Sequence, residues 1–262
     1  MIERRVAVIT GGAKGLGKQI ALSLAETGCN IVVSYLRSKS DACELVQQVE
    51  KLGVEALAIQ VDVTDSSALQ KLVQHTSDRF GSIDILINNA GPFFRERRKF
   101  AEYSMRDIQY LISSNFTSVM ELDHRVLPFM RRNNWGRIIH FGFAHAGEAR
   151  AWPHRAVYAA AKVGLVSFTK TLAVEEAESG ITVNMICPGD IRGDNKEKRI
   201  IDVEHLIDPE SPRGRPGTGE DVARVAAFLC RSESDFITGS MINVAGGVDP
   251  IRMWPLTKLE SE

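Results

Sequence analysis

Residues 6–17 read Val-Ala-Val-Ile-Thr-Gly-Gly-Ala-Lys-Gly-Leu-Gly, an apolar run that leads directly into a glycine-rich stretch. The run Val6–Thr10 predicts a β-strand, and the segment Ile20–Glu26 that follows the glycines predicts a helix. Glycines at a strand-to-helix turn let the backbone approach a phosphate closely, and the helix N-terminus offers it unpaired N–H groups. The spacing, with glycines at 11, 15 and 17, differs from the commonest G-x-G-x-x-G fingerprint. The sequence therefore predicts a dinucleotide-binding turn, and a glycine-rich turn without a ligand is the alternative.

The rest of the chain repeats this alternation of short β-rich runs and longer helical segments. Such alternation predicts parallel βαβ units and an α/β fold with a doubly wound parallel sheet and helices on both faces. No break in composition marks a second domain, so we expect a single domain over residues 1–262. The irregular segment 189–219 predicts a substrate lid within it. The further strands are expected at Asn30–Tyr35, Val54–Val61, Ile83–Ile87, Arg137–Phe141, Ile181–Ile186 and Ser240–Val244, and the helices at Ser40–Leu52, Asp65–Phe80, Ser104–Ile112, Phe116–Arg132, Tyr158–Glu178 and Val222–Cys230.

The composition excludes several classes of protein. Lys and Arg number 32 against 33 Asp and Glu, and this net charge of −1 argues against a nucleic-acid-binding protein. The first residues show no secretory pattern, and no stretch approaches the roughly 18 apolar residues that span a bilayer. We therefore expect a cytoplasmic protein without a membrane segment. The cysteines form no C-x-x-C pair, so we expect neither a disulfide framework nor a metal site; they are Cys29, Cys43, Cys187 and Cys230.

Two cations near the glycine-rich turn bear on the choice of cofactor. In NAD-selective sites an acidic residue about 20 positions after the glycines accepts the ribose hydroxyls. Here the second predicted strand ends in Tyr35-Leu-Arg-Ser38, without a carboxylate. Arg37 could pair with a 2′-phosphate and Lys14 could add a second positive charge, so the sequence favours NADP. Solvated surface charges are the alternative for both side chains.

Four separated motifs occur in the order in which one enzyme family carries them. They are Thr10-x-x-x-x-Gly15-x-Gly17, Asn88-Asn-Ala-Gly91, Tyr158-Ala-Ala-Ala-Lys162 and Pro188-Gly189. On these motifs the chain resembles the short-chain dehydrogenase/reductase family, and within it the 3-oxoacyl-(acyl-carrier-protein) reductases. The resemblance spans almost the whole chain. It implies a Rossmann-like fold, an oxidoreductase activity and a homotetramer.

The resemblance implies catalytic roles for three residues. Tyr158 would be the general acid that protonates a carbonyl, and Asn115 would hold a water in a proton relay; a helix cap or a buried amide is the alternative for Asn115. Lys162 follows Tyr158 by one helical turn and so lies on the same face. Its ammonium would lower the pKa of Tyr158 from the ordinary value of about 10 and would bind the nicotinamide ribose.

The resemblance also implies which residues bind the cofactor. Asp62 and Val63 would hold the adenine ring, and Ile191 would contact the nicotinamide amide. The remaining cofactor-binding residues would be Thr10, Gly11, Gly12, Lys14, Gly15, Leu16, Gly17, Arg37, Asn89, Ala90, Gly91, Tyr158, Lys162, Pro188 and Gly189.

The family's catalytic serine has no counterpart here, because residues 136–157 contain neither Ser nor Thr. Counting forward from Gly136 places the serine position at Phe143, whereas counting back from Tyr158 places it at His145. His145 is a candidate substitute, since an imidazole can donate a hydrogen bond to a developing oxyanion. An ordinary loop residue is the alternative. Gly193 also departs from the family, which usually has a threonine there.

The loop after the Asn-Ala-Gly motif would border the substrate mouth. Its basic run Arg95-Glu-Arg-Arg-Lys99 could steer an anionic group such as a phosphopantetheine or an acyl-carrier protein, or could be a solvated face. Phe93, Phe94 and Trp152 could line an apolar pocket or belong to the core. The leading hypothesis is an NADP-dependent reductase of a carbonyl substrate. The alternatives are a catalytically silent NADP(H)-binding protein that acts as a sensor or partner, and a reductase of a cyclic substrate such as a pterin.

Overall fold

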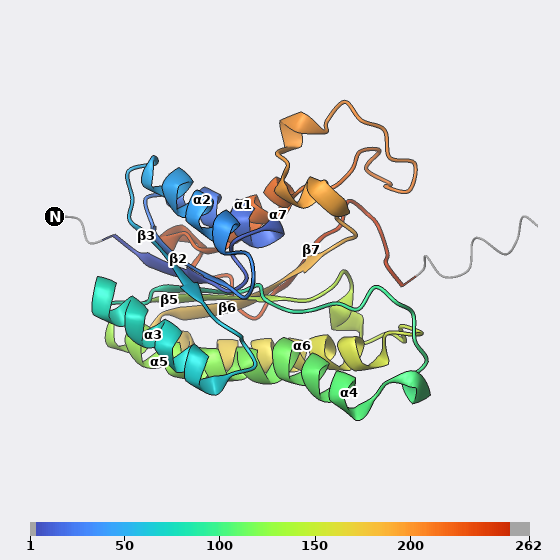
Figure 1. Cartoon of the computed structure of the whole chain (residues 1–262), viewed down its shortest axis with the longest axis horizontal. Helices are drawn as coiled ribbons and strands as arrows, with labels where there is room; N and C mark the ends of the chain where they lie inside the picture. The colour runs from blue at the N-terminus through green and yellow to red at the C-terminus, as the bar shows by residue number, and fades with distance from the viewer. Residues whose placement is uncertain (1–3, 252–262) are drawn as a thin grey trace, which may run out of the picture.

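A seven-stranded parallel β-sheet forms the centre of the structure, a computed structural model that describes residues 4–251 (Figure 1). The strands lie in the order β3-β2-β1-β4-β5-β6-β7, so the order reverses between β1 and β4. In open α/β sheets, ligands bind at the carboxyl ends of the strands beside such a point. The strands are β1 (Val6–Ile9), β2 (Asn30–Tyr35), β3 (Ala56–Gln60), β4 (Ile85–Asn88), β5 (Gly136–Phe141), β6 (Ile181–Pro188) and β7 (Met241–Val244).

Helices cover both faces of this sheet, as Figure 1 shows. One face carries α1 (Gly15–Glu26), α2 (Lys39–Glu50) and α7 (Gly219–Leu229), and the other carries α3 (Ser66–Phe80), α4 (Met105–Ile112), α5 (Ser118–Arg132) and α6 (Ala156–Glu175). Successive side chains of a strand point to opposite faces. Accordingly, Ala7 and Ile9 pack in the core beneath α1, and Val6 and Val8 pack in the core on the side of α3 and α5. The predicted α/β fold, a doubly wound parallel sheet, is confirmed.

The predicted elements are all present, with shifts of a few residues at their ends. The helix that carries the Tyr-x-x-x-Lys motif starts at Ala156 and ends at Glu175, because Ala177–Ser179 tightens into a 3₁₀ turn. The two helices expected around residue 113 are joined by a π-helical turn, Ser113–Thr117. Such turns are rare and often mark functional sites. A π-helical turn has more residues per turn than an α-helix, so it changes which side chains of the helix face the interior.

Helix α6 departs from the expectation that no segment reaches membrane-spanning length. By length and composition alone it could cross a membrane, and it is the one helix of residues 4–251 for which this holds. In the structure α6 packs on β5 and β6 and buries Leu165, Thr169 and Leu172 against them. Its apolar composition is explained by this place in the core, since a helix that packs on a buried sheet is apolar over much of its surface.

The segment 189–219 is irregular, as expected, and lies above the N-terminal ends of α1 and α7 (orange in Figure 1). It contains two short 3₁₀ turns, Gly193–Glu197 and Ile200–Asp202. The first of them packs against α1 and α7. The sequence also suggested that Met253-Trp-Pro255 packs across a subunit boundary, but these residues lie outside the described part of the chain.

Candidate active site

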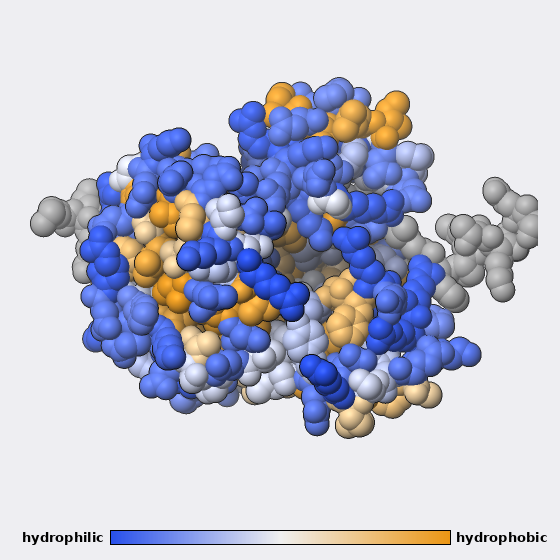
Figure 2. All heavy atoms as spheres, viewed as in Figure 1, coloured by the Kyte–Doolittle hydropathy of each residue, from blue (hydrophilic) through white to orange (hydrophobic). Residues whose placement is uncertain are grey.

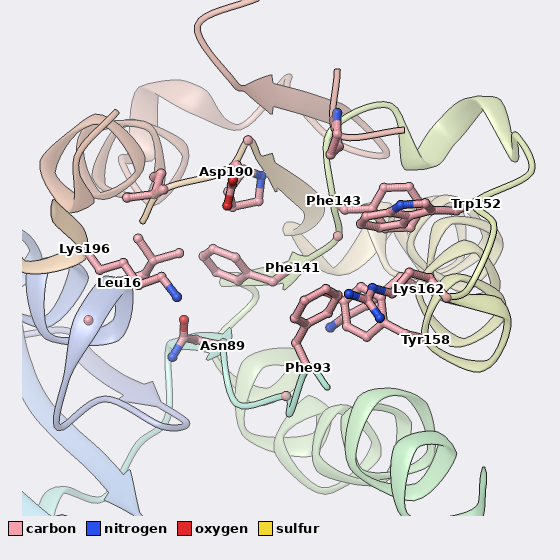
Figure 3. Close-up of a pocket in the computed structure, with 18 of the residues that line it drawn as sticks. Leu16, Asn89, Phe93, Phe141, Phe143, Trp152, Tyr158, Lys162, Asp190 and Lys196 are labelled. Carbon is pink, nitrogen blue, oxygen red and sulfur yellow. The ribbon is translucent and has the colours of Figure 1, made fainter. Parts of the chain in front are cut away.

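A cavity of about 560 Å³ opens at the carboxyl ends of the central strands. Figure 2 shows this side of the molecule, with a recess below segment 189–219, whose surface is partly polar and partly apolar. Side chains from the glycine-rich turn, from β4, β5 and β6, and from α6 converge on the cavity (Figure 3). Its position agrees with the rule for parallel sheets, in which ligands bind at the reversal of the strand order.

The glycine-rich turn is held close to the end of β4. A Cβ atom on Gly17 would lie 2.6 Å from the Gly11 carbonyl oxygen and 2.7 Å from Asn89 Nδ2, so glycine alone fits there. Asn89 Nδ2 donates to the carbonyl oxygens of Thr10 and Gly11, at 2.9 and 3.0 Å. The Thr10 hydroxyl accepts from the Ala90 amide at 2.9 Å. The structure therefore brings the first two motifs together as the sequence predicted.

Two smaller pockets extend the cavity along the ends of β2 and β3. One of about 350 Å³ is lined by Asp62 and Val63, which the resemblance assigned to the adenine ring, and by Ala90 and Gly91, which it assigned to the cofactor. The next, of about 290 Å³, is lined by Lys14 and Arg37 together with Gly11 and Ser38.

The two cations of the second pocket differ in their partners. Lys14 Nζ lies 3.0 Å from a carboxylate oxygen of Asp41 in the first turn of α2. Within residues 4–251, no carboxylate forms an ion pair with Arg37, which is exposed. A phosphate in this pocket would therefore meet one cation that is already partly neutralised and one that is not.

Tyr158 and Lys162 project from one face of α6 into the main cavity (Figure 3). Lys162 Nζ lies 5.8 Å from the centre of the Tyr158 ring. Burial lowers the pKa of Lys162 to about 8. Burial raises the pKa of Tyr158, and the nearby Cys187 acts in the same direction. The pKa of Tyr158 thus shifts upward, opposite to the direction expected from Lys162, because the desolvation of the phenol is the largest effect.

Asn115 lies in the π-helical turn and faces Lys162. Its Nδ2 donates to the carbonyl oxygen of Pro92 at 3.0 Å. Its Oδ1 is buried and has no hydrogen-bond partner among residues 4–251. A Cβ atom on Gly91 would lie 2.6 Å from this oxygen and 3.4 Å from Lys162 Nζ, so the absent side chain of Gly91 lets the two groups converge. A buried acceptor usually has a hydrogen-bond partner, which can be a water or a ligand. Here a water or a ligand in the cavity could donate to this oxygen.

Phe143, which the forward count from Gly136 gave as the serine position, lies in the cavity. Its ring lines the cavity with its centre 6.3 Å from that of Tyr158, and it packs against Trp152 at 4.7 Å. Phe93 meets Tyr158 edge-on at 5.0 Å. Of the two positions that the counts gave, only Phe143 therefore lines the cavity, where it forms part of an aromatic wall.

His145 does not reach the cavity, contrary to the substitute role considered for it. Its backbone is left-handed, with φ of 66°, and its side chain is not among those that line the cavity. The ring Nδ1 lies 2.7 Å from a carboxylate oxygen of Glu148, and the amide N–H donates to Asn243. Phe94 also lies apart from the main cavity and stacks on Tyr110.

Pro188, Gly189 and Ile191 line the opposite wall of the cavity, where the resemblance placed the nicotinamide. A Cβ atom on Gly189 would lie 2.8 Å from Ala245 Cα, so glycine is required where β6 ends beside β7. Cys187, buried just before this motif, has its pKa raised to about 12 by burial, and Lys162 partly offsets that rise. The sequence singled out this thiol only as one of four cysteines.

The charged residues at the site that the sequence did not predict include Glu197 and Arg155. The Glu197 carboxylate accepts from the Gly15 amide at 2.8 Å and from Lys18 Nζ at 3.1 Å. It thus lies on the N-terminus of α1, where a phosphate was expected. Arg155 lines the cavity one turn before Tyr158. Its position on the same helical face was a usable signal, whereas nothing in the sequence connects Glu197 with a turn so far away along the chain.

The residues present fit a nicotinamide dinucleotide. The closely packed glycine cradle, the pockets beside Asp62 and Arg37, and the unpartnered Asn115 oxygen follow one another along the sheet edge. Among the described residues, no group of three or more His, Cys, Asp or Glu side chains is arranged to hold a metal ion.

Comparisons with known proteins agree with this geometry. A family model described as Enoyl-(Acyl carrier protein) reductase matches residues 11–249. YtkK of Bacillus subtilis, provisionally named an oxidoreductase, is 43% identical over 248 residues, which cover 94% of this chain and 97% of YtkK. FabG of Staphylococcus epidermidis, a 3-oxoacyl-[acyl-carrier-protein] reductase, is 34% identical over 242 residues, which cover 92% of this chain and 98% of FabG.

Solved structures give the same result. One from Bacillus thuringiensis, provisionally named a 3-oxoacyl-reductase, is 45% identical, with a TM-score of 0.88 and coverage of 95% of this chain and 99% of that one. Acetoin dehydrogenase YohF of Salmonella typhimurium is 28% identical, with a TM-score of 0.85 and coverage of 94% and 98%. With the ordered motifs and the Tyr158–Lys162 pair in the cavity, these matches assign the chain to the short-chain dehydrogenase/reductase family, whose members are oxidoreductases that use a nicotinamide cofactor.

Proposed function

We propose that the protein reduces a carbonyl compound with NADPH and that Tyr158 donates the proton. The observation that carries this proposal is that Tyr158 and Lys162 face the same cavity as Gly15 and Gly189. When bound there, NADPH would supply a hydride to the carbonyl carbon. Tyr158 gives its phenolic proton to the carbonyl oxygen. The hydride on carbon and this proton on oxygen together convert the ketone into an alcohol.

Lys162 and Asn115 support the proton transfer. The buried ammonium of Lys162 stabilises the phenolate that develops on Tyr158, and this effect is strong because the surroundings exclude water. The free Oδ1 of Asn115 beside Lys162 would hold a water that returns a proton to the site. Both roles follow from the positions of these side chains around Gly91.

The preference for NADP rests on Arg37 and Lys14. Both line the pocket at the end of β2, where the ribose 2′-phosphate would lie. No carboxylate ends β2 to accept ribose hydroxyls. A guanidinium without a protein ion-pair partner favours a phosphate, since it can bind two of its oxygens at once.

A second candidate function is supported by Phe143. An oxyanion donor at its position would typically contribute about 100–1000-fold in rate. Its replacement by an aromatic ring favours a silent member that binds NADP(H) and acts as a sensor or partner protein. His145, which lies outside the cavity, does not make up for the loss.

One assay separates the two functions. NADPH oxidation is followed with β-ketoacyl thioesters, simple ketones and pterins, with Tyr158→Phe as the control that removes the proton donor and keeps the ring. Turnover that disappears in Tyr158→Phe supports the reductase. Tight NADPH binding without turnover on any of these substrates supports the silent member and excludes the reductase for these substrate classes.

The remaining features of the proposal follow the family. A 3-oxoacyl thioester on an acyl-carrier protein is a candidate substrate, since FabG is named for that class and basic residues 95–99 border the cavity mouth. We propose one domain over residues 1–262, segment 189–219 as its lid, and a cytoplasmic homotetramer assembled through α5 and α6. Light scattering would test the tetramer by its mass, and a monomer would exclude it.

A further inference from the structure

The substrate end of the cavity combines an aromatic wall with positive charge. Phe93, Phe143 and Trp152 surround the Tyr158 ring with centre-to-centre distances of 5.0, 6.3 and 6.2 Å (Figure 3). Phe93 remains 43% exposed although it is a large apolar side chain. These rings offer a broad, flat apolar surface beside the proton donor. Such a surface favours a flat apolar group on the substrate.

Arg155 brings an uncompensated positive charge to this wall. Its side chain is buried and its guanidinium lies 4.7 Å from the centre of the Phe93 ring. The Nη groups donate to the carbonyl oxygens of Arg95, Glu96 and His154, and not to a carboxylate. Within the described part of the chain, no acidic side chain forms an ion pair with Arg155. A buried cation without a counter-charge is costly, and an anion in the adjacent cavity would relieve that cost.

Arg97 adds a second positive charge at the mouth. It is exposed and lines the same cavity. Burial lowers the pKa of Arg155, and the like charge of Arg97 acts in the same direction. The acidic residue that lines the cavity, Asp190, has its carboxylate 2.6 Å from Arg192. Two arginine side chains, Arg97 and Arg155, therefore lie at the end of the cavity where the aromatic rings lie.

The size of the cavity limits the rest of the substrate. Its volume of about 560 Å³ extends from Gly15 and Leu16 to Arg155 and must also hold the nicotinamide end of the cofactor. The room left for the substrate suits a compact molecule better than a long acyl chain.

From these observations we infer that the substrate is a small aryl 2-oxo acid, whose ring packs on Phe93 and Trp152 and whose carboxylate faces Arg97 and Arg155. The inference rests on the proposed function and names its substrate class. Bound NADPH would supply the hydride to the keto carbon, Tyr158 protonates the carbonyl oxygen, and the product is the aryl 2-hydroxy acid. The carboxylate remains unchanged, so its pairing with the arginines adds binding energy without taking part in the reaction.

Binding tests the inference independently of turnover. We expect the NADP⁺-saturated protein to bind mandelate at least about tenfold more tightly than either mandelamide, which lacks the charge, or lactate, which lacks the ring, by calorimetry. Arg97→Gln should abolish the advantage of mandelate over mandelamide. Arg95→Gln, which removes the same charge from the same loop outside the cavity lining, should keep it. Equal affinities for mandelate and mandelamide, or equal losses in the two variants, would overturn the inference.

Turnover then separates this inference from the proposed function. The expected result is reduction of benzoylformate with kcat/KM at least about tenfold above those of pyruvate and acetoacetyl-coenzyme A. Selective mandelate binding without reduction of benzoylformate would support the binding site and contradict the reductase. Reduction of acetoacetyl-coenzyme A alone would support the reductase and overturn the aryl 2-oxo acid.

Discussion

At the level of single residues, the charge of Lys162 sets an upper pH limit for the proposed reaction. Burial lowers the pKa of Lys162 to about 8, so the charge is present below this pH and is lost as the pH rises through it. Tyr158 keeps its proton over the same range, because burial raises its pKa. We expect kcat/KM for carbonyl reduction, which reports the free enzyme, to fall as the pH rises through about 8.

Lys162→Arg is the matched control for this pH limit. A guanidinium stays charged at every accessible pH, so the fall near pH 8 should move to higher pH or vanish. The assignment to Lys162 is excluded if the variant retains the same fall, or if the wild-type profile is flat to about pH 9.

Phe143 provides a second residue-scale prediction, because it stands where a hydroxyl would act. Phe143→Ser should reduce small ketones at least about tenfold faster than Phe143→Ala, since one oxyanion donor typically contributes about 100–1000-fold. Both variants remove the same buried ring and should lose about 3–5 kcal/mol in free energy of unfolding. Steady-state kinetics of the two variants at equal folded fraction give the comparison. Equal rates would show that a hydroxyl at this position does not reach the reacting oxygen.

At the level of elements, the 3₁₀ turn Gly193–Glu197 places an acidic side chain on the N-terminus of α1. The Glu197 carboxylate accepts from the Gly15 amide and Lys18, two donors that would otherwise be available to a phosphate. Glu197→Gln removes the charge and can keep the hydrogen bond to Gly15. We expect roughly fivefold tighter NADPH binding, as an anion at a helix N-terminus contributes about 1 kcal/mol. Fluorescence titration of NADPH measures the change.

Glu210→Gln is the control for Glu197. It removes an acidic charge from the same segment 189–219, where Glu210 pairs with Arg192 away from the glycine-rich turn. NADPH affinity should stay unchanged in this variant. If Glu197→Gln instead weakens NADPH binding, the carboxylate holds the segment in its binding position and does not compete with the cofactor.

A buried polar network ties β4, β5, α5 and α6 together. His140 lies 2.8 Å from Asp123 through Nε2 and 2.8 Å from the Thr169 hydroxyl through Nδ1. Asn88 Nδ2 donates to the other oxygen of Asp123 at 2.7 Å. Asp123→Ala leaves His140 and Asn88 without this partner in the core. We expect a loss of about 3–5 kcal/mol in free energy of unfolding, measured by urea denaturation.

The exposed Asp78 on α3 gives the comparison for this network. Asp78→Ala removes a carboxylate that accepts from Gln74 at the surface, and should change the free energy of unfolding by no more than about 0.5 kcal/mol. A loss below about 1 kcal/mol in Asp123→Ala would mean that water or a rearranged side chain satisfies His140.

The same elements show how far the sequence determines the site. The strands and helices were predictable because both faces of a parallel sheet are buried, which leaves apolar runs such as Val6–Ile9 between polar helices. The forward count to Phe143 runs along strand β5 and gave a residue that lines the cavity. The count back from Tyr158 to His145 crosses the irregular loop 144–155 and gave a residue outside the cavity lining. Glu197 and the π-helical turn depend on packing between distant segments, which a linear pattern does not contain.

At the level of the whole molecule, the proposed cofactor would contact the ends of most central strands. The glycine-rich turn follows β1, Arg37 follows β2, Asp62 follows β3, and Gly91 and Gly189 follow β4 and β6. A ligand that binds all of them in the folded state, and none in the unfolded state, stabilises the sheet as one unit. NADPH at about 100 times its Kd should then add about 2.7 kcal/mol to the free energy of unfolding. For a chain of this size the Tm should rise by roughly 5–11 °C.

The cofactor preference should appear in the same measurement. NADH at the same concentration should raise the Tm less than NADPH, because only NADPH carries the 2′-phosphate that Arg37 and Lys14 would bind. Arg37→Asp should reverse the order, since its carboxylate repels the phosphate and accepts the ribose hydroxyls of NADH. Equal shifts with NADH and NADPH in the wild type would remove Arg37 from the site while leaving the nucleotide cradle in place. No shift with either would mean that the cradle built from Gly17, Asn89 and Thr10 does not hold a dinucleotide, and the reductase and the silent NADP(H)-binding protein would be excluded together.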